Sequence, residues 1–111
     1  MSTSADESPV LDALAAITAE SVERTKGDPN SVMAARIAAL VAVDAPVASY
    51  LMHVGVAAEA GVTVEQVQDI LIAIAPIVGT ARTLSAGLKI TEALGLALIE
   101  LEEEAEAEEA Q

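Results

Sequence analysis

Apolar side chains recur at helical spacing from the N-terminal part of the chain onward, and the first stripe lies between a helix-start signal and a helix-stop signal. Ser8 is expected to cap this helix with Pro9 at its first position, and Lys26-Gly27-Asp28-Pro29 is expected to end it. The stripe itself consists of Val10, Leu11, Leu14, Ile17, Thr18 and Val22.

The same signals, a capping residue followed by an apolar face, predict the next two helices. Asn30 or Ser31 is expected to cap the second helix, whose apolar side holds Met33, Ile37, Leu40 and Val41. Asp44 interrupts this pattern and can cap a third helix, which tolerates Pro46 in its first turn and ends at Gly61.

Two more helical segments complete the pattern. Residues 63–66 read Thr-Val-Glu-Gln, a capping-box sequence that predicts a helix start. Residues 70–78 are apolar on all sides, which is typical of a buried helix end, and Pro76 is expected to kink or end it. Gly79 restarts the chain, and a further helix is expected to continue to Gly95.

This organisation predicts an all-α protein of about five to six helices. Residues 1–99 are expected to form a single helical domain, with residues 1–7 as a flexible arm. Residues 100–111 form an acidic C-terminal tail, which is expected to solvate a fraying helix end. A docking tail for a protein partner is the alternative interpretation of this Glu-rich segment.

Composition adds an argument for self-association. The chain has 111 residues, of which 53% are apolar, and it contains neither Phe nor Trp. A domain of this length buries only about two-thirds of its unfolded surface, so one small core cannot hide so many apolar positions. A homo-oligomer is the simplest way to bury the remainder.

Charge and cysteine content exclude several classes of function. A net charge of −13 repels nucleic acids and anionic membranes. The sequence has no Cys, so this chain can form neither a disulfide nor a thiolate metal site. Its single His has no carboxylate three or four residues on, which argues against a metal site. No secretory signal or membrane span is evident, so a cytoplasmic protein without a cofactor is expected.

Two stretches resemble a known family. They are HVGVAAEAGVTVEQV, which starts at His53, and DILIAIAPIVGTAR, which starts at Asp69. Together with the order of helices over roughly residues 31–95, they resemble the carboxymuconolactone decarboxylase and alkylhydroperoxidase D-like family. The resemblance implies the alkylhydroperoxidase D-like helical bundle and homo-oligomers, commonly trimers or hexamers.

The resemblance does not bring the family's chemistry with it. The redox branch uses C-x-x-C-x-x-x-H, and counting back from His53 places its two Cys at Pro46 and Ser49. Thiol peroxidase activity is therefore not expected. The cofactor-free decarboxylase branch has a Glu at the position of Ser49, and often a His at that of Ala73 and a Tyr at that of Ile77.

The candidate site residues cluster around the only His. Ser49 and His53 are four residues apart and share a helix face, so they could act as nucleophile and base, or His53 alone could move a proton. A purely structural His53 is the plainer interpretation. Tyr50 is a candidate ligand contact, and Arg82 could hold a carboxylate through its two guanidinium donors.

Two functions follow from these residues. The first is a small-ligand-binding or structural oligomer without thiol redox chemistry. The alternative is a cofactor-independent lyase, decarboxylase or isomerase that acts on a small lactone or carboxylic acid, with His53 as general acid or base.

Overall fold

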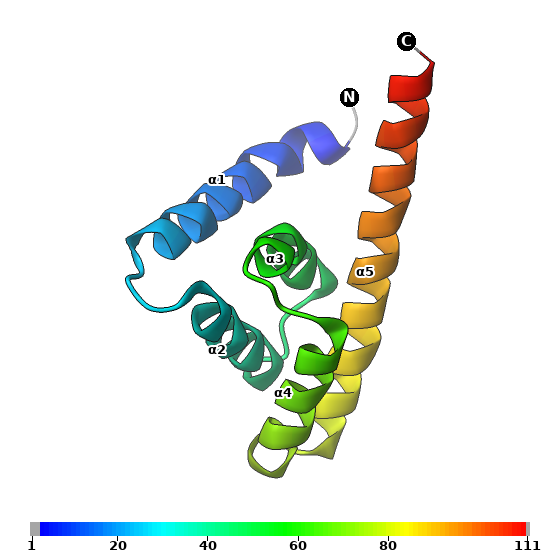
Figure 1. The fold of residues 1–111 in the computed structure, drawn as a ribbon. Coiled ribbons are helices and arrows are strands. Elements are labelled where there is room, and N and C mark those ends of the chain that lie inside the picture. The colour runs from blue at the N-terminus through cyan, green and yellow to red at the C-terminus, as the bar shows by residue number, and fades with distance from the viewer. Residues whose placement is uncertain (1–2, 111) are drawn as a thin grey trace.

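A computed structural model describes the backbone of residues 3–110 and the side chains of residues 9–110. Within this range the chain forms five helices and no strand (Figure 1). In chain order they are α1 (Thr3–Arg24), α2 (Pro29–Ala42), α3 (Val47–Glu59), α4 (Val64–Val78) and α5 (Thr80–Glu109). The predicted all-α class with about five to six helices is confirmed.

Both ends of the helical pattern differ from expectation. α1 begins at Thr3, so the predicted N-cap at Ser8 is wrong and Pro9 lies inside the helix. Pro9 lies in the second turn of α1, where a proline removes one intrahelical hydrogen bond and crowds the preceding turn. Of the expected arm, residues 1–2 lie outside the described residues, whereas residues 3–7 form the first turns of α1.

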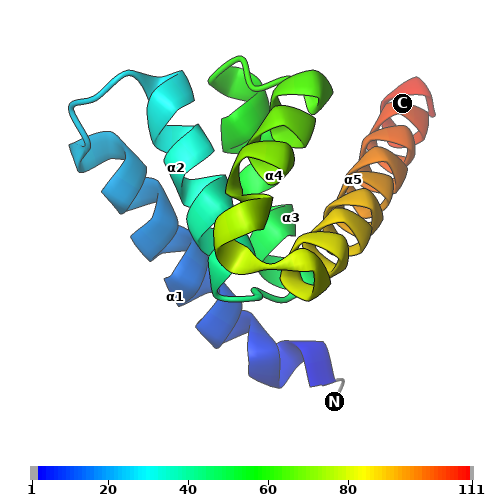
Figure 2. The ribbon, with the colours of Figure 1, turned by 90° about the horizontal axis from the view of Figure 1, so that it is seen from below.

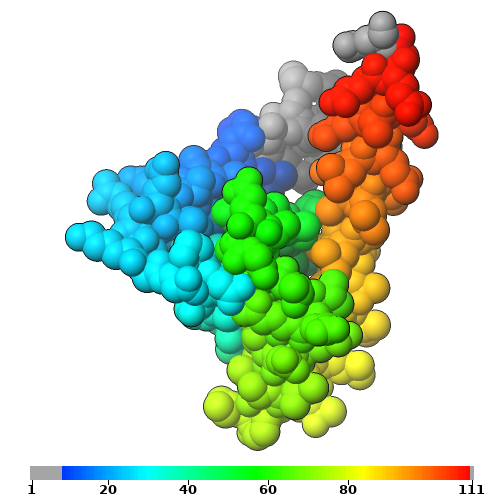
Figure 3. Space-filling view, viewed as in Figure 1, coloured from blue at the N-terminus to red at the C-terminus, as the bar shows by residue number. Residues whose placement is uncertain are grey.

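The predicted break at Gly95 is also wrong. α5 passes through Gly95 as one helix and takes in most of the acidic tail, up to Glu109. A single glycine in a helix interior costs about 1 kcal/mol relative to Ala, which is too little to stop a helix with strong formers on both sides. Figures 1 and 3 show this last part of α5, in orange and red, projecting beyond the rest of the molecule.

The start of α2 is capped by Asp28, two residues before Asn30 and three before Ser31, so the predicted cap is wrong. The Asp28 carboxylate accepts the backbone N–H of Ser31 at 3.0 Å, and Pro29 occupies the first turn. Asn30 is therefore free for another role. Its side chain donates to the Gln66 Oε1 at 3.0 Å and accepts from the Gln66 Nε2 at 2.6 Å, which ties the start of α2 to the start of α4.

The predicted cap at Thr63 is confirmed, because its hydroxyl accepts the backbone N–H of Gln66 at 3.1 Å. The Gln66 side chain does not complete the capping box and bonds Asn30 instead. Gly61 follows α3 with φ of 79°, and the next residue, Val62, donates its N–H to the Ala57 carbonyl at 3.0 Å. This is a Schellman ending, and it confirms the predicted stop at Gly61.

The end of α2 is a second Schellman turn, built on an aspartate. Asp44 has φ of 53°, and Ala45 donates its N–H to the Leu40 carbonyl at 3.0 Å. The prediction that Asp44 caps α3 is wrong: Pro46 holds the N-cap position of α3, without a side-chain bond. An aspartate tolerates the left-handed conformation better than most residues, and here its carboxylate is engaged elsewhere.

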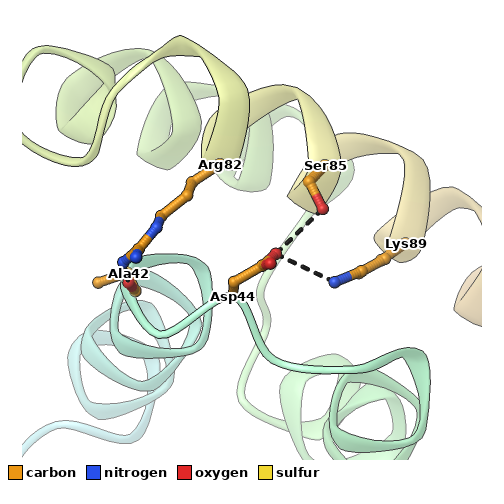
Figure 4. A network of polar contacts seen from close by, with 5 residues as sticks. All are labelled: Ala42, Asp44, Arg82, Ser85 and Lys89. Atoms are coloured by element: carbon orange, nitrogen blue, oxygen red, sulfur yellow. Dashed lines mark hydrogen bonds and ion pairs between the residues drawn. The ribbon is translucent and has the colours of Figure 1, made fainter.

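Two side chains of α5 bind that carboxylate (Figure 4). Ser85 Oγ and Lys89 Nζ both donate to Asp44 Oδ1 at 3.0 Å. One turn earlier on α5, the Arg82 guanidinium donates to the backbone carbonyl of Ala42, the last residue of α2. One cation, Arg82, thus bonds the last carbonyl of α2, and a second, Lys89, lies beside it on the Asp44 carboxylate; positive charge is the favourable sign for a helix C-terminus.

The packed body consists of α2, α3, α4 and α5, and α1 makes few contacts with it. Figure 2 shows α1 running along one side of the body and α5 along another. The core is formed by residues of small or medium volume. Its buried members are Val41, Ala45, Tyr50, Ala86 and Ala93, with Leu40, Val47, Leu51, Val54, Leu71, Ile74, Val78 and Ile90 packed against them.

A single residue joins α4 to α5. Gly79 has φ of 95° and ψ of 158°, a backbone conformation that is essentially restricted to glycine. The expectation that the chain restarts here is confirmed. Pro76 lies in the last turn of α4, which ends two residues later at Val78. Among the described residues, no helix is both long and apolar enough to cross a membrane.

The Asp44 network predicts a specific dependence of stability on pH. The hydrogen bond and charge of Lys89, together with the Ser85 hydrogen bond, hold the pKa of Asp44 below its ordinary value of 3.8. The ionised carboxylate therefore contributes stability that is fully present above pH 3.8 and is lost as the pH falls through the lower folded-state pKa.

We expect Asp44→Asn to lower the urea midpoint of unfolding at about pH 6 and to have a smaller effect near about pH 2.5, because the contribution of the wild-type carboxylate is being lost as the pH falls below 3.8. Asparagine keeps the side-chain shape and tolerates positive φ, so the comparison isolates the charge. An equal difference between the two proteins at both pH values would contradict this account.

Candidate functional site

The candidate residues Ser49, Tyr50 and His53 all lie on α3. His53 is buried, with 8% of its surface exposed. Its Nδ1–H donates to the backbone carbonyl of Ser49 at 2.8 Å, one turn earlier in the same helix. This bond fixes the tautomer, because a ring that donates from Nδ1 presents Nε2 as an acceptor.

The remaining ring nitrogen is also occupied. Arg36 Nη1, from α2, lies 3.4 Å from His53 Nε2, and a guanidinium can only donate. The same guanidinium donates from Nη2 to the Ser21 hydroxyl on α1. His53 is thus the inner end of a polar chain that links three helices.

Ser49 does not meet His53 as a nucleophile meets its base. The bond between them uses the backbone carbonyl of Ser49, and no hydrogen bond joins the Ser49 hydroxyl to the ring. Nucleophilic catalysis by a serine depends on its hydroxyl bonding the histidine nitrogen. The two residues share a helix face, as the sequence predicts, without forming that pair.

A cavity of about 400 Å³ lies between α2, α3, α4 and α5 and contacts both Tyr50 and His53. Aliphatic side chains make up most of its wall, and no Asp, Glu, Lys or Arg is among the lining residues. The lining residues are Ile37, Leu40, Tyr50, His53, Val54, Ala57, Ala58, Val62, Thr63, Val64, Val67, Gln68, Leu71, Gly87, Ile90, Thr91, Ala93 and Leu94. Neither Ser49 nor Arg82 belongs to this set.

Tyr50 is the unusual residue of the cavity wall. It is 4% exposed, and its buried hydroxyl has no hydrogen-bond partner among the described residues. Burial raises the pKa of Tyr50, and the charge of Asp44 raises it further, so the hydroxyl keeps its proton. An unpaired buried hydroxyl costs about 1–3 kcal/mol of stability.

Arg82, the predicted carboxylate contact, lies outside this cavity wall. Its guanidinium binds the Ala42 carbonyl at the end of α2, away from the cavity wall (Figure 4). No local pattern predicts the contact between Arg36 and His53, because the two residues are 17 positions apart on different helices. In the part of the chain that the structure describes, no group of three His, Asp or Glu side chains is placed to hold a metal ion.

Comparison with known proteins adds one match. A family model described as the Carboxymuconolactone decarboxylase family matches residues 9–93. This range includes α2, α3, α4 and the half of α5 that packs against them. The resemblance noted over residues 31–95 is thereby confirmed. No curated protein and no solved structure gave a significant match.

The polar chain through His53 predicts a structural effect of its removal. We expect His53→Ala to lower the free energy of unfolding by about 2 kcal/mol, because it deletes two hydrogen bonds and leaves a void beside α2. The free energies come from urea unfolding followed by circular dichroism.

Arg36→Met should be destabilising as well, and a double-mutant cycle with His53→Ala should give a coupling of about 1 kcal/mol. Arg24→Met is the control, because Arg24 forms only an exposed ion pair with Glu20. Strictly additive effects of the His53 and Arg36 variants would show that their contact contributes nothing.

Proposed function

Because this chain belongs to the carboxymuconolactone decarboxylase family, we propose that it is a homo-oligomer that binds a small ligand between α2, α3, α4 and α5. It uses no thiol redox chemistry. The cavity that contacts Tyr50 and His53 carries this proposal, since an apolar pocket with a few polar groups is the usual form of a small-molecule site.

The absence of thiol chemistry follows from composition. A dithiol mechanism needs two sulfur atoms that alternate between thiol and disulfide. The 111 residues include no Cys, and Pro46 and Ser49 stand where the family's redox motif has its pair. Both positions serve the helix here: Pro46 is the N-cap of α3, and the Ser49 carbonyl holds His53.

The shape and surface of the protomer support the oligomer. Its radius of gyration is 15.3 Å, whereas a compact domain of this length has about 13 Å. Its accessible surface is 7531 Å², whereas a compact monomer of 11.3 kDa exposes about 5,700 Å². The difference, about 1,800 Å² on one protomer, exceeds the roughly 800 Å² that each partner buries in an interface of standard size.

Large apolar side chains are exposed on three helices of the protomer. On α1 they are Val10, Leu11, Leu14 and Ile17, on α4 they are Val64, Ile72 and Ile77, and on α5 they are Leu84, Leu88, Leu94, Leu96, Leu98, Ile99 and Leu101. Ile77 is 85% exposed in the isolated protomer. Exposed apolar stripes of this extent are typical of interaction surfaces, which supports the proposal that further copies of the chain cover them.

The enzymatic alternative is a cofactor-independent lyase, decarboxylase or isomerase with His53 as general acid or base. It is less well supported, because both ring nitrogens of His53 already have partners. A proton transfer at Nε2 would require Arg36 to leave, and no carboxylate lines the cavity to act with the ring.

Ligand binding can be tested by filling the cavity. Gly87 lines it, and a Cβ added there would meet no atom within 4 Å, so Gly87→Leu places a side chain in the free space. We expect the neutral fluorescent probe N-phenyl-1-naphthylamine to bind wild type with increased emission, and Gly87→Leu to reduce its affinity at least about tenfold.

Gly95→Leu is the matched control, since Gly95 is in the same helix and outside the cavity wall. Circular dichroism verifies that both variants remain helical. Equal probe binding by Gly87→Leu and wild type would place the probe elsewhere and remove the support for a cavity site.

Oligomerisation can be tested on the exposed face of α5. Leu84 and Leu88 are one turn apart, and 65% and 67% of their surface is exposed in the protomer. We expect wild type to be larger than 11.3 kDa in light scattering coupled to size exclusion, and the double variant Leu84→Glu, Leu88→Glu to shift toward the protomer mass.

Ala35→Glu adds the same charge on the outer face of α2, where no large apolar side chain is exposed among the described residues, and should leave the mass unchanged. A wild-type mass of one protomer at micromolar concentration would refute the oligomer.

A further inference from the structure

One face of α5 has no partner among the described residues of the protomer. Its members recur at helical spacing and are exposed, and we call them the outer face: Leu84, Leu88, Thr91, Gly95 and Leu98. Ala86 and Ala93 lie on the opposite side of the helix and are buried in the core. Figures 1 and 2 show α5 at the edge of the molecule, with no other described helix on its outer side.

The side-chain sizes along the outer face are complementary to the same face turned end over end. Leu88 and Gly95 lie at similar distances on either side of Thr91, and so do Leu84 and Leu98. When two copies of a helix cross antiparallel about a twofold axis, residues at equal distances from the axis meet. An axis near Thr91 would therefore bring Leu88 over the partner's Gly95, a large side chain over a small one.

Gly95 has no explanation within the protomer. Glycine is among the poorest helix formers, and Gly95 lies in the interior of α5 without a positive φ. A Cβ added there would meet no atom within 4 Å, so the protomer itself leaves room for a larger residue. A leucine of a second helix seated at this position would account for the small residue.

We propose that the outer face of α5 pairs with the outer face of α5 in a second copy, antiparallel, about a twofold axis near Thr91. The inference rests on the homo-oligomer proposed above and deepens it by naming the contact surface and its orientation. The exposed apolar residues of α1 and α4 take no part in this contact, so it does not limit the assembly to two copies.

The charges of α5 favour the antiparallel orientation. The helix begins without a side-chain cap and without an acid in its first turn, and residues 100–109 at its other end contain seven Glu. Acids stabilise a helix N-terminus and oppose a C-terminus, so both ends of α5 carry an unfavourable charge pattern for an isolated helix. A partner that runs in the opposite direction corrects both ends.

The register of the pair brings these ends together. With the axis near Thr91, Glu102 and Glu103 lie level with the first turn of the partner's α5, where backbone N–H groups lack intrahelical acceptors. A parallel pair would instead place the two Glu-rich ends side by side, where their charges repel. Size and charge thus favour the same arrangement.

Disulfide cross-linking of the full-length protein tests the arrangement, because a chain without Cys reports only on the thiol that is introduced. Thr91→Cys, Leu98→Cys and Ala35→Cys are each oxidised with copper–phenanthroline and resolved on a non-reducing denaturing gel. Ala35, exposed on α2, measures the background from random collisions.

We expect Thr91→Cys to form a covalent dimer, because each copy of this residue faces its counterpart at the axis. Leu98→Cys should stay at background. Its two copies would lie about 20 Å apart along the helix axis, whereas a disulfide spans Cα atoms about 4–7 Å apart.

A second substitution tests the seat at Gly95. Added to Thr91→Cys, Gly95→Leu should lower the yield of covalent dimer at least about tenfold, because the new side chain occupies the place of the partner's Leu88. Ala35→Leu is the matched control and should leave the yield unchanged, since it adds the same side chain to an exposed position of α2.

The outcomes separate this inference from the homo-oligomer on which it rests. Cross-linking of Leu98→Cys, alone or to the same extent as Thr91→Cys, would refute the antiparallel crossing. If wild type exceeds the mass of one protomer but Thr91→Cys stays at background, the α5 pairing is wrong while the homo-oligomer stands. A wild-type mass of one protomer, with no covalent dimer above background, would refute both.

Discussion

The helices of this chain enclose more space than their side chains fill. The buried apolar residues are Met33, Ile37, Val41, Ala45, Tyr50, Ala86 and Ala93, so three of seven are alanines. Close-packed interiors require matched side-chain volume, and a chain without Phe or Trp has little to supply. The cavity, which is open to solvent, and the many exposed apolar side chains are two results of this shortage of side-chain volume.

Polar contacts between helices add stability where the core has little side-chain volume. Asp44, Lys89 and Arg82 fasten the end of α2 to α5, and the amide pair of Asn30 and Gln66 fastens the start of α2 to α4. The bonds from His53 through Arg36 to Ser21 add α1, which otherwise packs little on the body. These directional bonds set the positions of helices that small side chains alone would leave free to slide.

The role of His53 changes within this framework. A lone histidine in a motif region suggests chemistry, yet its ring serves as a bridge from the Ser49 carbonyl to the Arg36 guanidinium. Tyr50, three residues earlier, differs from His53 because its hydroxyl has no hydrogen-bond partner among the described residues. The imidazole thus joins α3 to α2 through its two hydrogen bonds, whereas the phenol contributes buried volume.

Local signals in the sequence were sufficient to predict the helices but not the contacts between residues of different helices. The helical spacing of apolar residues, the Thr63 cap and Gly61 act over a few residues, and each was predicted correctly. Asp44 was misread because its partners, Ser85 and Lys89, are 41 and 45 residues away and convert a plausible cap into an interhelical anchor.

The same limit, that contacts between helices are not visible in local sequence, applies to the candidate site. Tyr50 and His53 were identified from their position on one helix, and both contact the cavity. Arg82 was chosen because it follows a turn in the sequence, whereas the packing of α5 on α2 brings it to the Ala42 carbonyl. That the Tyr50 hydroxyl is unpaired depends on four helices at once, and no sequence pattern encodes it.

The junction at Gly79 has a consequence for how this chain can change in length. One added residue there would rotate α5 by about 100° about its own axis relative to α4. Ala86 and Ala93 would turn out of the core, and Lys89 would lose Asp44. An insertion in the exposed segment 25–28 would displace only α1. Insertions and deletions are therefore tolerable before α2 and forbidden between α4 and α5.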